Sequence, residues 1–140
     1  LGIQEHSNTV SLFKYAKEIG ADYILAKEIQ TSNYSVVLEK IDTFLYECDS
    51  AYITICTDVF SSAFAPGVSA SQTLGLDPEA VLPLLKHILR TRQVRGFDIC
   101  EISPRFDQDN TTAKLGAVLI FAVVNTLCKL NNLAIDVLTH

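Results

Sequence analysis

The sequence lacks the signals that mark several classes of protein. It has no methionine and a formal net charge of −5, and no basic stripe that would suit nucleic acid. Its cysteines show no Cys-x-x-Cys spacing, so we expect reduced, buried thiols in a cytoplasmic protein. No signal peptide is visible, and the apolar run 115–124 is too short to span a bilayer. We therefore expect a buried helix there and neither a nucleic-acid nor a membrane partner.

What is present indicates a globular domain. Of the 140 residues, 49% are hydrophobic and 19% are charged, which is enough for one domain with its own core. The chain begins inside a strand-like stretch, "LGIQ", and has no methionine. We therefore interpret residues 1–140 as a single α/β domain that is a fragment of a larger protein, or as a processed chain.

Helical and strand patterns alternate along the chain. Helices are predicted from Asn8 to Gly20, from Ser32 or Asn33 to Tyr46 with Val36 and Phe44 among its inward residues, from Asp77 to about Arg92, and from Thr111 or Thr112 to Leu130. Strands are predicted over residues 22–26, 51–57 and 94–102, and the tail 132–140 fits either type. This alternation predicts a parallel sheet with helices on both faces.

Two of the predicted strands end in acidic residues. Asp58 follows the strand 51–57, and Glu101 lies at the end of the strand 94–102. Ligands of such sheets bind at the carboxyl ends of the strands, so both acids should face the same rim. A helix cap or a loop salt bridge is the plainer explanation for either acid taken alone.

Two motifs surround these acids. The first is Thr54-Ile55-Cys56-Thr57-Asp58 followed by Ala65-Pro66-Gly67, and the second is Asp98-Ile99-Cys100-Glu101-Ile102-Ser103-Pro104, continued by Asp107 and Thr112-Ala113. They resemble the Ser-x-Asp-x-Asp, Ala-Pro-Gly and Asp-x-x-Glu-x-x-Pro motifs of the ureohydrolases, the family of arginases, agmatinases and formimidoylglutamases. The resemblance covers about residues 50–125, and its "APGVSA" stretch is most similar to formimidoylglutamases.

The resemblance implies a fold and an activity. The fold would be a three-layer α/β/α ureohydrolase (arginase-like) fold with a mainly parallel sheet. Residues 1–140 would be the carboxy-terminal portion of that larger domain. The activity would be hydrolysis of the C–N bond of a linear amidine, with N-formimidoyl-L-glutamate, a compound of histidine degradation, giving L-glutamate and formamide. The complete enzyme would hold two Mn²⁺ ions, act on a small molecule and form a homo-oligomer in the cytoplasm.

Residue roles also follow from the resemblance. Asp58 matches the second aspartate of the first motif and would bind metal, while Cys56 replaces a metal-bridging aspartate with a softer ligand. Glu101 matches the acid that pairs with the cationic group of the substrate, a catalytic contact that suits a planar carboxylate. Ser69, in the loop 61–72 that would wall the pocket, would contact the substrate's carboxylate. The alternatives are a buried thiol without metal for Cys56 and a plain loop residue for Ser69.

The histidines depart from the family pattern. His6, His87 and His140 are the only ones, and the family's Gly-Gly-x-His and Asp-x-His-x-Asp motifs are missing. Cys56 and Asp58 alone make a poor Mn²⁺ site, because hard ions need several oxygen or nitrogen donors. We therefore expect this chain by itself to be inactive and without its full metal set. Two alternatives stay open: another ureohydrolase (an agmatinase, an arginase or a guanidino-acid hydrolase), or a non-catalytic fragment or metal-free relative.

Overall fold

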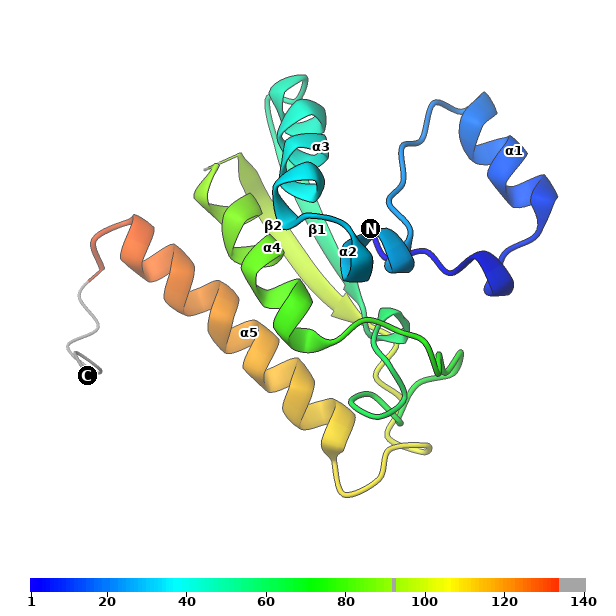
Figure 1. Ribbon diagram of the computed structural model, residues 1–140. Helices are drawn as coiled ribbons and strands as arrows, with labels where there is room; N and C mark the ends of the chain where they lie inside the picture. The colour runs from blue at the N-terminus through cyan, green and yellow to red at the C-terminus, as the bar shows by residue number, and fades with distance from the viewer. Residues whose placement is uncertain (92, 134–140) are drawn as a thin grey trace.

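The structure is a computed structural model that describes residues 1–91 and 93–133. At its centre two parallel strands, β1 (Ala51–Cys56) and β2 (Val94–Cys100), pair with Ile55 opposite Ile99. The helix α4 (Pro78–Arg90) lies between them in sequence, and α5 (Thr111–Leu130) follows β2. Figure 1 shows α4 and α5 side by side along the strands. The predicted parallel strands and the helix between them are confirmed.

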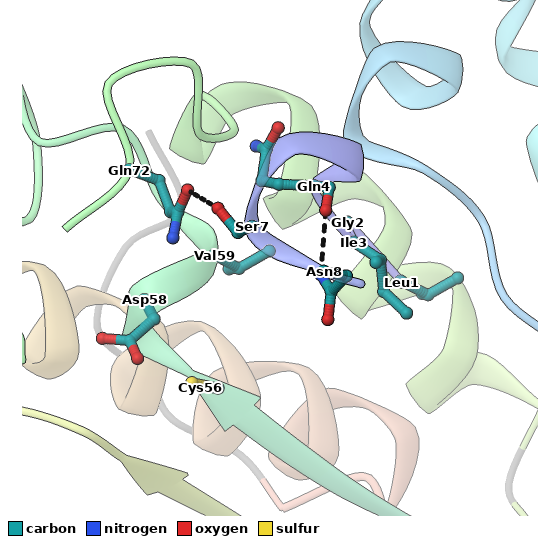
Figure 2. Close-up of a pocket in the computed structure, with 10 residues that line it drawn as sticks. All are labelled: Leu1, Gly2, Ile3, Gln4, Ser7, Asn8, Cys56, Asp58, Val59 and Gln72. Atoms are coloured by element: carbon teal, nitrogen blue, oxygen red, sulfur yellow. Dashed lines mark hydrogen bonds between the residues drawn. The ribbon is translucent and has the colours of Figure 1, made fainter. Parts of the chain in front are cut away.

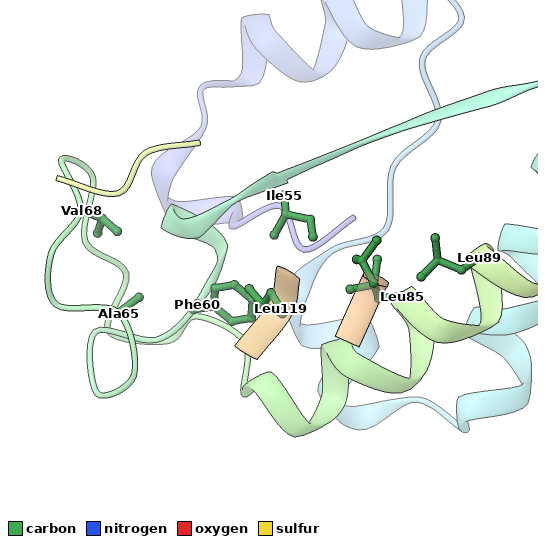
Figure 3. Close-up of a cluster of buried hydrophobic side chains, with 8 residues drawn as sticks. Ile55, Phe60, Ala65, Val68, Leu85, Leu89 and Leu119 are labelled. Atoms are coloured by element: carbon green, nitrogen blue, oxygen red, sulfur yellow. The ribbon is translucent and has the colours of Figure 1, made fainter. Parts of the chain in front are cut away.

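The main core lies between these helices and one face of the strand pair (Figure 3). Because side chains alternate along a strand, Ile53 and Ile55 point into this core while Tyr52 and Thr54 point to the opposite face. Tyr52 is 65% exposed on that face. Within the described residues, the chain therefore contributes two of the three predicted layers. The buried members of the core are Ile55, Phe60, Ala65, Val68, Leu85, Leu89, Leu119 and Val123.

A second cluster joins α3 (Tyr34–Tyr46) to α4. Asn33 caps α3 as predicted, since its side chain accepts a hydrogen bond from Ser35 N at 3.1 Å. Val36 and Phe44 were expected to face inward, which is wrong, because they are 45% and 55% exposed. The face that packs holds Val37, Ile41 and Leu45, against Leu84 of α4.

The amino-terminal part differs more from the predictions. The helix α1 (Val10–Glu18) begins after Thr9, whose side chain accepts from Leu12 N at 3.4 Å, so the predicted cap at Asn8 is wrong by one residue. The predicted strand 22–26 is reduced to a parallel bridge between Ile3 and Leu25. It stops there because a helix, α2 (Ala26–Thr31), begins at the next residue. Residues 134–140 of the ambiguous tail lie outside the described residues.

The helix α5 is longer and more exposed than the predicted buried run. It has 20 residues and contains an 18-residue stretch with a mean hydropathy of 1.7, of which 22% is buried. By length and composition alone, such a helix could cross a membrane. One face packs in the core through Leu119 and Val123, both 0% exposed. The opposite face leaves Val118 52% and Phe121 61% exposed. The expectation of a fully buried helix is therefore wrong for the outer face, and the expected lack of a membrane partner stays a prediction.

Candidate functional site

The two predicted acids lie at the same edge of the strand pair. Asp58 sits in the short 3₁₀ turn Thr57–Val59 directly after β1, and Glu101 directly follows β2. Thr57, 0% exposed, ties the two strand ends together, since its Oγ1 donates to the Cys100 carbonyl oxygen at 3.0 Å. The predicted shared rim is therefore confirmed, and Thr57, which the motif treats as a variable position, helps to hold it.

The surroundings of Asp58 disfavour the ionised form of its carboxyl group. Burial raises its pKa, and the negative charge of Glu101 adds to the shift, while a hydrogen bond from the backbone of Ala70 opposes it. Its Oδ1 is buried and has no hydrogen-bond partner. Such an oxygen costs free energy unless something pairs with it. Asp58 is thus suited to receive a cation or a donor group of a ligand.

Glu101 is held in an unusual backbone conformation. Its φ of 65° lies in the left-handed region, which residues with a side chain seldom adopt. Its carboxylate is exposed at the rim and accepts a hydrogen bond from Ser69 Oγ at 2.9 Å. Strain of this kind persists where surrounding contacts impose it, often at functional sites. Ser69 therefore lies against Glu101, and its predicted contact with a substrate stays a prediction.

Cys56 is a neutral thiol at the end of β1, two residues before Asp58. Its pKa is raised from 9.0 to about 11, chiefly by burial; a hydrogen bond from the backbone of Asp58 opposes the shift, and the Asp58 carboxylate and Cys100 add to it. Cys56 and Cys100 are register partners on β1 and β2, and neither forms a disulfide. The thiolate that a metal would need is disfavoured here without a nearby cation.

The donors present do not make a complete metal site. The residues that the structure describes contain no group of three or more His, Cys, Asp or Glu side chains able to hold a metal ion. His87 instead pairs with Asp42, with 2.6 Å between its Nε2 and Oδ1, and so joins α4 to α3. The unpaired oxygen of Asp58 fits a metal role, but one carboxylate and one neutral thiol do not fit two Mn²⁺ ions.

An open pocket of about 190 Å³ lies beside Cys56 and Asp58 (Figure 2). The segment before α1 forms one wall, and Gln72, at the end of the loop 61–72, forms part of another. Ser7 Oγ donates to Gln72 Oε1 at 2.8 Å and joins these walls. Gln72 is the one residue of the loop 61–72 among those that line this pocket, and Ser69 and Glu101 do not line it. The predicted substrate pocket walled by this loop therefore stays a prediction.

The roles predicted from the sequence leave out one buried residue, Thr112, which contacts the loop 61–72. Thr112, 0% exposed, accepts a hydrogen bond from Gly67 N on its Oγ1 at 2.7 Å. Asp107 in turn accepts from Thr112 N at 2.9 Å and Ala113 N at 3.0 Å. The sequence carries no ordinary capping signal for this arrangement, because Asp107 lies three positions before Asn110, the N-cap residue of α5.

Comparison with known proteins agrees with the motifs. A model of the arginase family matches residues 1–125. The chain is 53% identical over 135 residues to a formimidoylglutamase of Clostridium tetani, covering 96% of this chain and 40% of that protein. It is 47% identical over 120 residues to one of Staphylococcus aureus strain MRSA252, covering 86% of this chain and 39% of that protein.

Solved structures show the same fold. The formimidoylglutamase of Bacillus subtilis superposes with a TM-score of 0.84 at 25% identity, covering 91% of this chain and 40% of that one. An arginase from Bacillus caldovelox superposes with a TM-score of 0.74 at 20% identity, covering 82% and 39%. The chain thus spans about 40% of the length of these relatives, and its fold is part of the arginase-like fold. The resemblance seen in the motifs is confirmed: this chain belongs to the arginase family.

Proposed function

We propose that this chain is part of an amidine hydrolase that converts N-formimidoyl-L-glutamate and water to L-glutamate and formamide. Its role would be to bind the cationic group of the substrate. In that reaction water adds to the formimidoyl carbon, and the bond from this carbon to the glutamate nitrogen breaks. The support comes from the formimidoylglutamase relatives and from one observation of the site: Glu101 is fixed at the rim by Ser69, beside Asp58.

Glu101 has the chemistry that an amidinium substrate needs. A planar carboxylate accepts two N–H bonds from a planar cation, and the contact is charge-assisted. The exposed carboxylate already has one Ser69 contact, which leaves further lone pairs for the substrate. Asp58 would serve as a metal ligand through its unpaired oxygen, and Cys56 as a ligand only where a nearby cation lowers its pKa. One carboxylate and one thiol do not complete a manganese site, so the remaining metal ligands would have to come from outside this chain.

The test is a hybrid enzyme, since this chain matches about 40% of its relatives' length. This chain replaces the matching segment of the Clostridium tetani formimidoylglutamase, and release of formamide is measured with Mn²⁺ present. We expect activity with N-formimidoyl-L-glutamate, none with arginine or agmatine, and none from residues 1–140 alone. The Glu101→Gln variant should raise KM strongly, whereas Glu39→Gln, exposed on α3, should leave activity unchanged.

Two results would contradict the proposal. Cleavage of arginine or agmatine in preference to the formimidoyl substrate would assign the chain to another ureohydrolase. A folded hybrid that binds Mn²⁺ but hydrolyses none of these compounds would favour the non-catalytic alternative. The proposed small-molecule substrate, homo-oligomer and cytoplasmic location rest on the same family resemblance.

A further inference from the structure

The backbone of Gly67 is the point where the loop between the two acids meets the rest of the fold. Its N–H donates to Thr112 Oγ1 at 2.7 Å, and its carbonyl oxygen accepts from Ser103 N at 2.8 Å. Thr112 belongs to the first turn of α5, and Ser103 lies two positions after Glu101. One peptide group is therefore attached both to α5 and to the segment that carries Glu101.

The approach at Gly67 is too close for any other residue. A Cβ atom there would lie 2.4 Å from the Cβ of Asp107 and 2.6 Å from its Cα. Asp107 itself is fixed, because its two carboxylate oxygens accept from the backbone of Thr112 and Ala113. Burial alone would raise the pKa of Asp107, but hydrogen bonds from Thr112, Ala113 and Gln108 outweigh it and lower the pKa. Asp107 is thus an ionised anchor for the start of α5.

The loop beyond Gly67 then meets both rim acids. Two positions later, Ser69 Oγ donates to the Glu101 carboxylate at 2.9 Å. At the next position, the backbone of Ala70 forms a hydrogen bond with Asp58. Neither Ser69 nor Ala70 is buried. They directly follow two buried residues: Gly67, with its two backbone hydrogen bonds, and Val68, which packs in the main core.

We propose that Thr112 and Asp107 are positioning residues for Glu101 and Asp58, acting through Gly67 and the exposed residues Ser69 and Ala70. The proposal rests on the proposed function for the role it gives to Glu101. Because the Glu101 backbone is strained and its side chain is exposed, the orientation of this carboxylate depends on the contacts around it. The threonine hydroxyl, which never touches the rim, therefore sets the geometry that receives the substrate cation.

The first test uses residues 1–140 and amide hydrogen exchange. Thr112→Val keeps the shape of the side chain and removes the oxygen that accepts from Gly67 N, whereas Thr112→Ser keeps that oxygen. We expect Thr112→Val to speed exchange about tenfold or more at both Gly67 and Ala70, and Thr112→Ser to stay close to wild type. Val123→Ala, a core substitution in α5, is the control for a general loss of stability. It should not speed exchange at Gly67 and Ala70 more than at other amides.

The second test uses the hybrid enzyme described above. Misplacing Glu101 should lower kcat/KM about 10- to 100-fold in Thr112→Val, mainly by raising KM, because Glu101 holds the substrate. Thr112→Ser should restore activity to within a few-fold of wild type. A residue that only stabilises the fold would lower the amount of active enzyme without changing KM.

The results separate this proposal from the proposed function. Faster exchange at Gly67 with no change at Ala70 or in KM would overturn the positioning role, whatever the activity. An inactive wild-type hybrid would refute the proposed function, and exchange at Ala70 in residues 1–140 would still decide whether Thr112 controls the rim. Should Thr112→Val not fold, Asp107→Asn tests the same link: faster exchange at Ala70 supports it, and unchanged exchange contradicts it.

Discussion

A carboxylate at position 56 gives the sharpest test of the strand-end site. Cys56 stands where the first family motif has an aspartate, and it is partly buried, two residues before Asp58 and in register with Cys100. Replacing it with Asp restores the motif but adds a second carboxylate beside Asp58. Cys56→Asn is the matched control, since it has the same shape without the charge. The comparison therefore isolates what a negative charge costs at this position.

The expected cost follows from the thiol that is there now. The pKa of Cys56 is raised from 9.0 to about 11 by burial first and then by Asp58 and Cys100. A difference of about 2 in pKa corresponds to about 3 kcal/mol against negative charge. Because the side chain is only partly buried, solvent screening reduces this to about 1–2 kcal/mol. At neutral pH, Cys56→Asp should have a free energy of unfolding lower than that of Cys56→Asn by this amount.

Urea unfolding over a range of pH measures the difference. The introduced carboxyl group has a higher pKa in the folded chain than its unfolded value of about 4, so the cost is absent below the unfolded pKa and complete above the folded one. Mn²⁺ should restore part of the stability of Cys56→Asp and little of that of Cys56→Asn, because paired carboxylates attract a divalent cation. Equal stability of the two variants at every pH would refute the reasoning about this site.

Three further changes test the fold and the rim. Leu119→Ala, at a 0% exposed position, should lower the free energy of unfolding by about 3 kcal/mol in urea, whereas Phe121→Ala on the exposed face of α5 should change it by less than about 0.5 kcal/mol. Asp77→Ala removes the side chain that accepts from Glu79 N at 2.8 Å and should cost about 1 kcal/mol in thermal unfolding. Because burial and Glu101 raise the pKa of Asp58, the wild type should lose stability relative to Asp58→Asn as pH rises from the unfolded to the folded pKa of that carboxyl; a constant difference between them would contradict the shift.

The elements that the sequence predicted well are those with local signals at their ends. Asn33 and Asp77 cap α3 and α4 through their own side chains, and Pro78 occupies the first position of α4. The predicted strand 22–26 failed because Leu25 has no such signal. Its N–H is taken by the Glu28 carboxylate at 2.8 Å, which starts α2. A short apolar run does not reveal whether its backbone continues as a strand or enters a helix.

The site could be predicted in part for a similar reason. Parallel strands that end together bring Asp58 and Glu101 to one edge, and this needs only the order of the elements. The left-handed backbone of Glu101 and its hydrogen bond from Ser69 could not be predicted in this way. They depend on the path of the loop 61–72, which contains Pro66 and Gly67. No local pattern encodes that path, because it results from contacts with α5, far along the sequence.

The arrangement of these contacts separates the two halves of the proposed chemistry. The contacts that orient Glu101 run through Ser69, Gly67 and Thr112 and lie entirely within the described chain. The donors for a metal do not, since Asp58 keeps a buried oxygen without a partner and Cys56 is a neutral thiol. The contacts that orient Glu101, the proposed partner of the substrate cation, therefore include neither Asp58 nor Cys56. Under the proposed function, Ser69→Ala, which removes the hydrogen bond to Glu101 alone, should impair substrate binding while Mn²⁺ affinity is kept, and a variant of Asp58 should do the reverse. Loss of both properties from either variant would show that the rim acts as one unit.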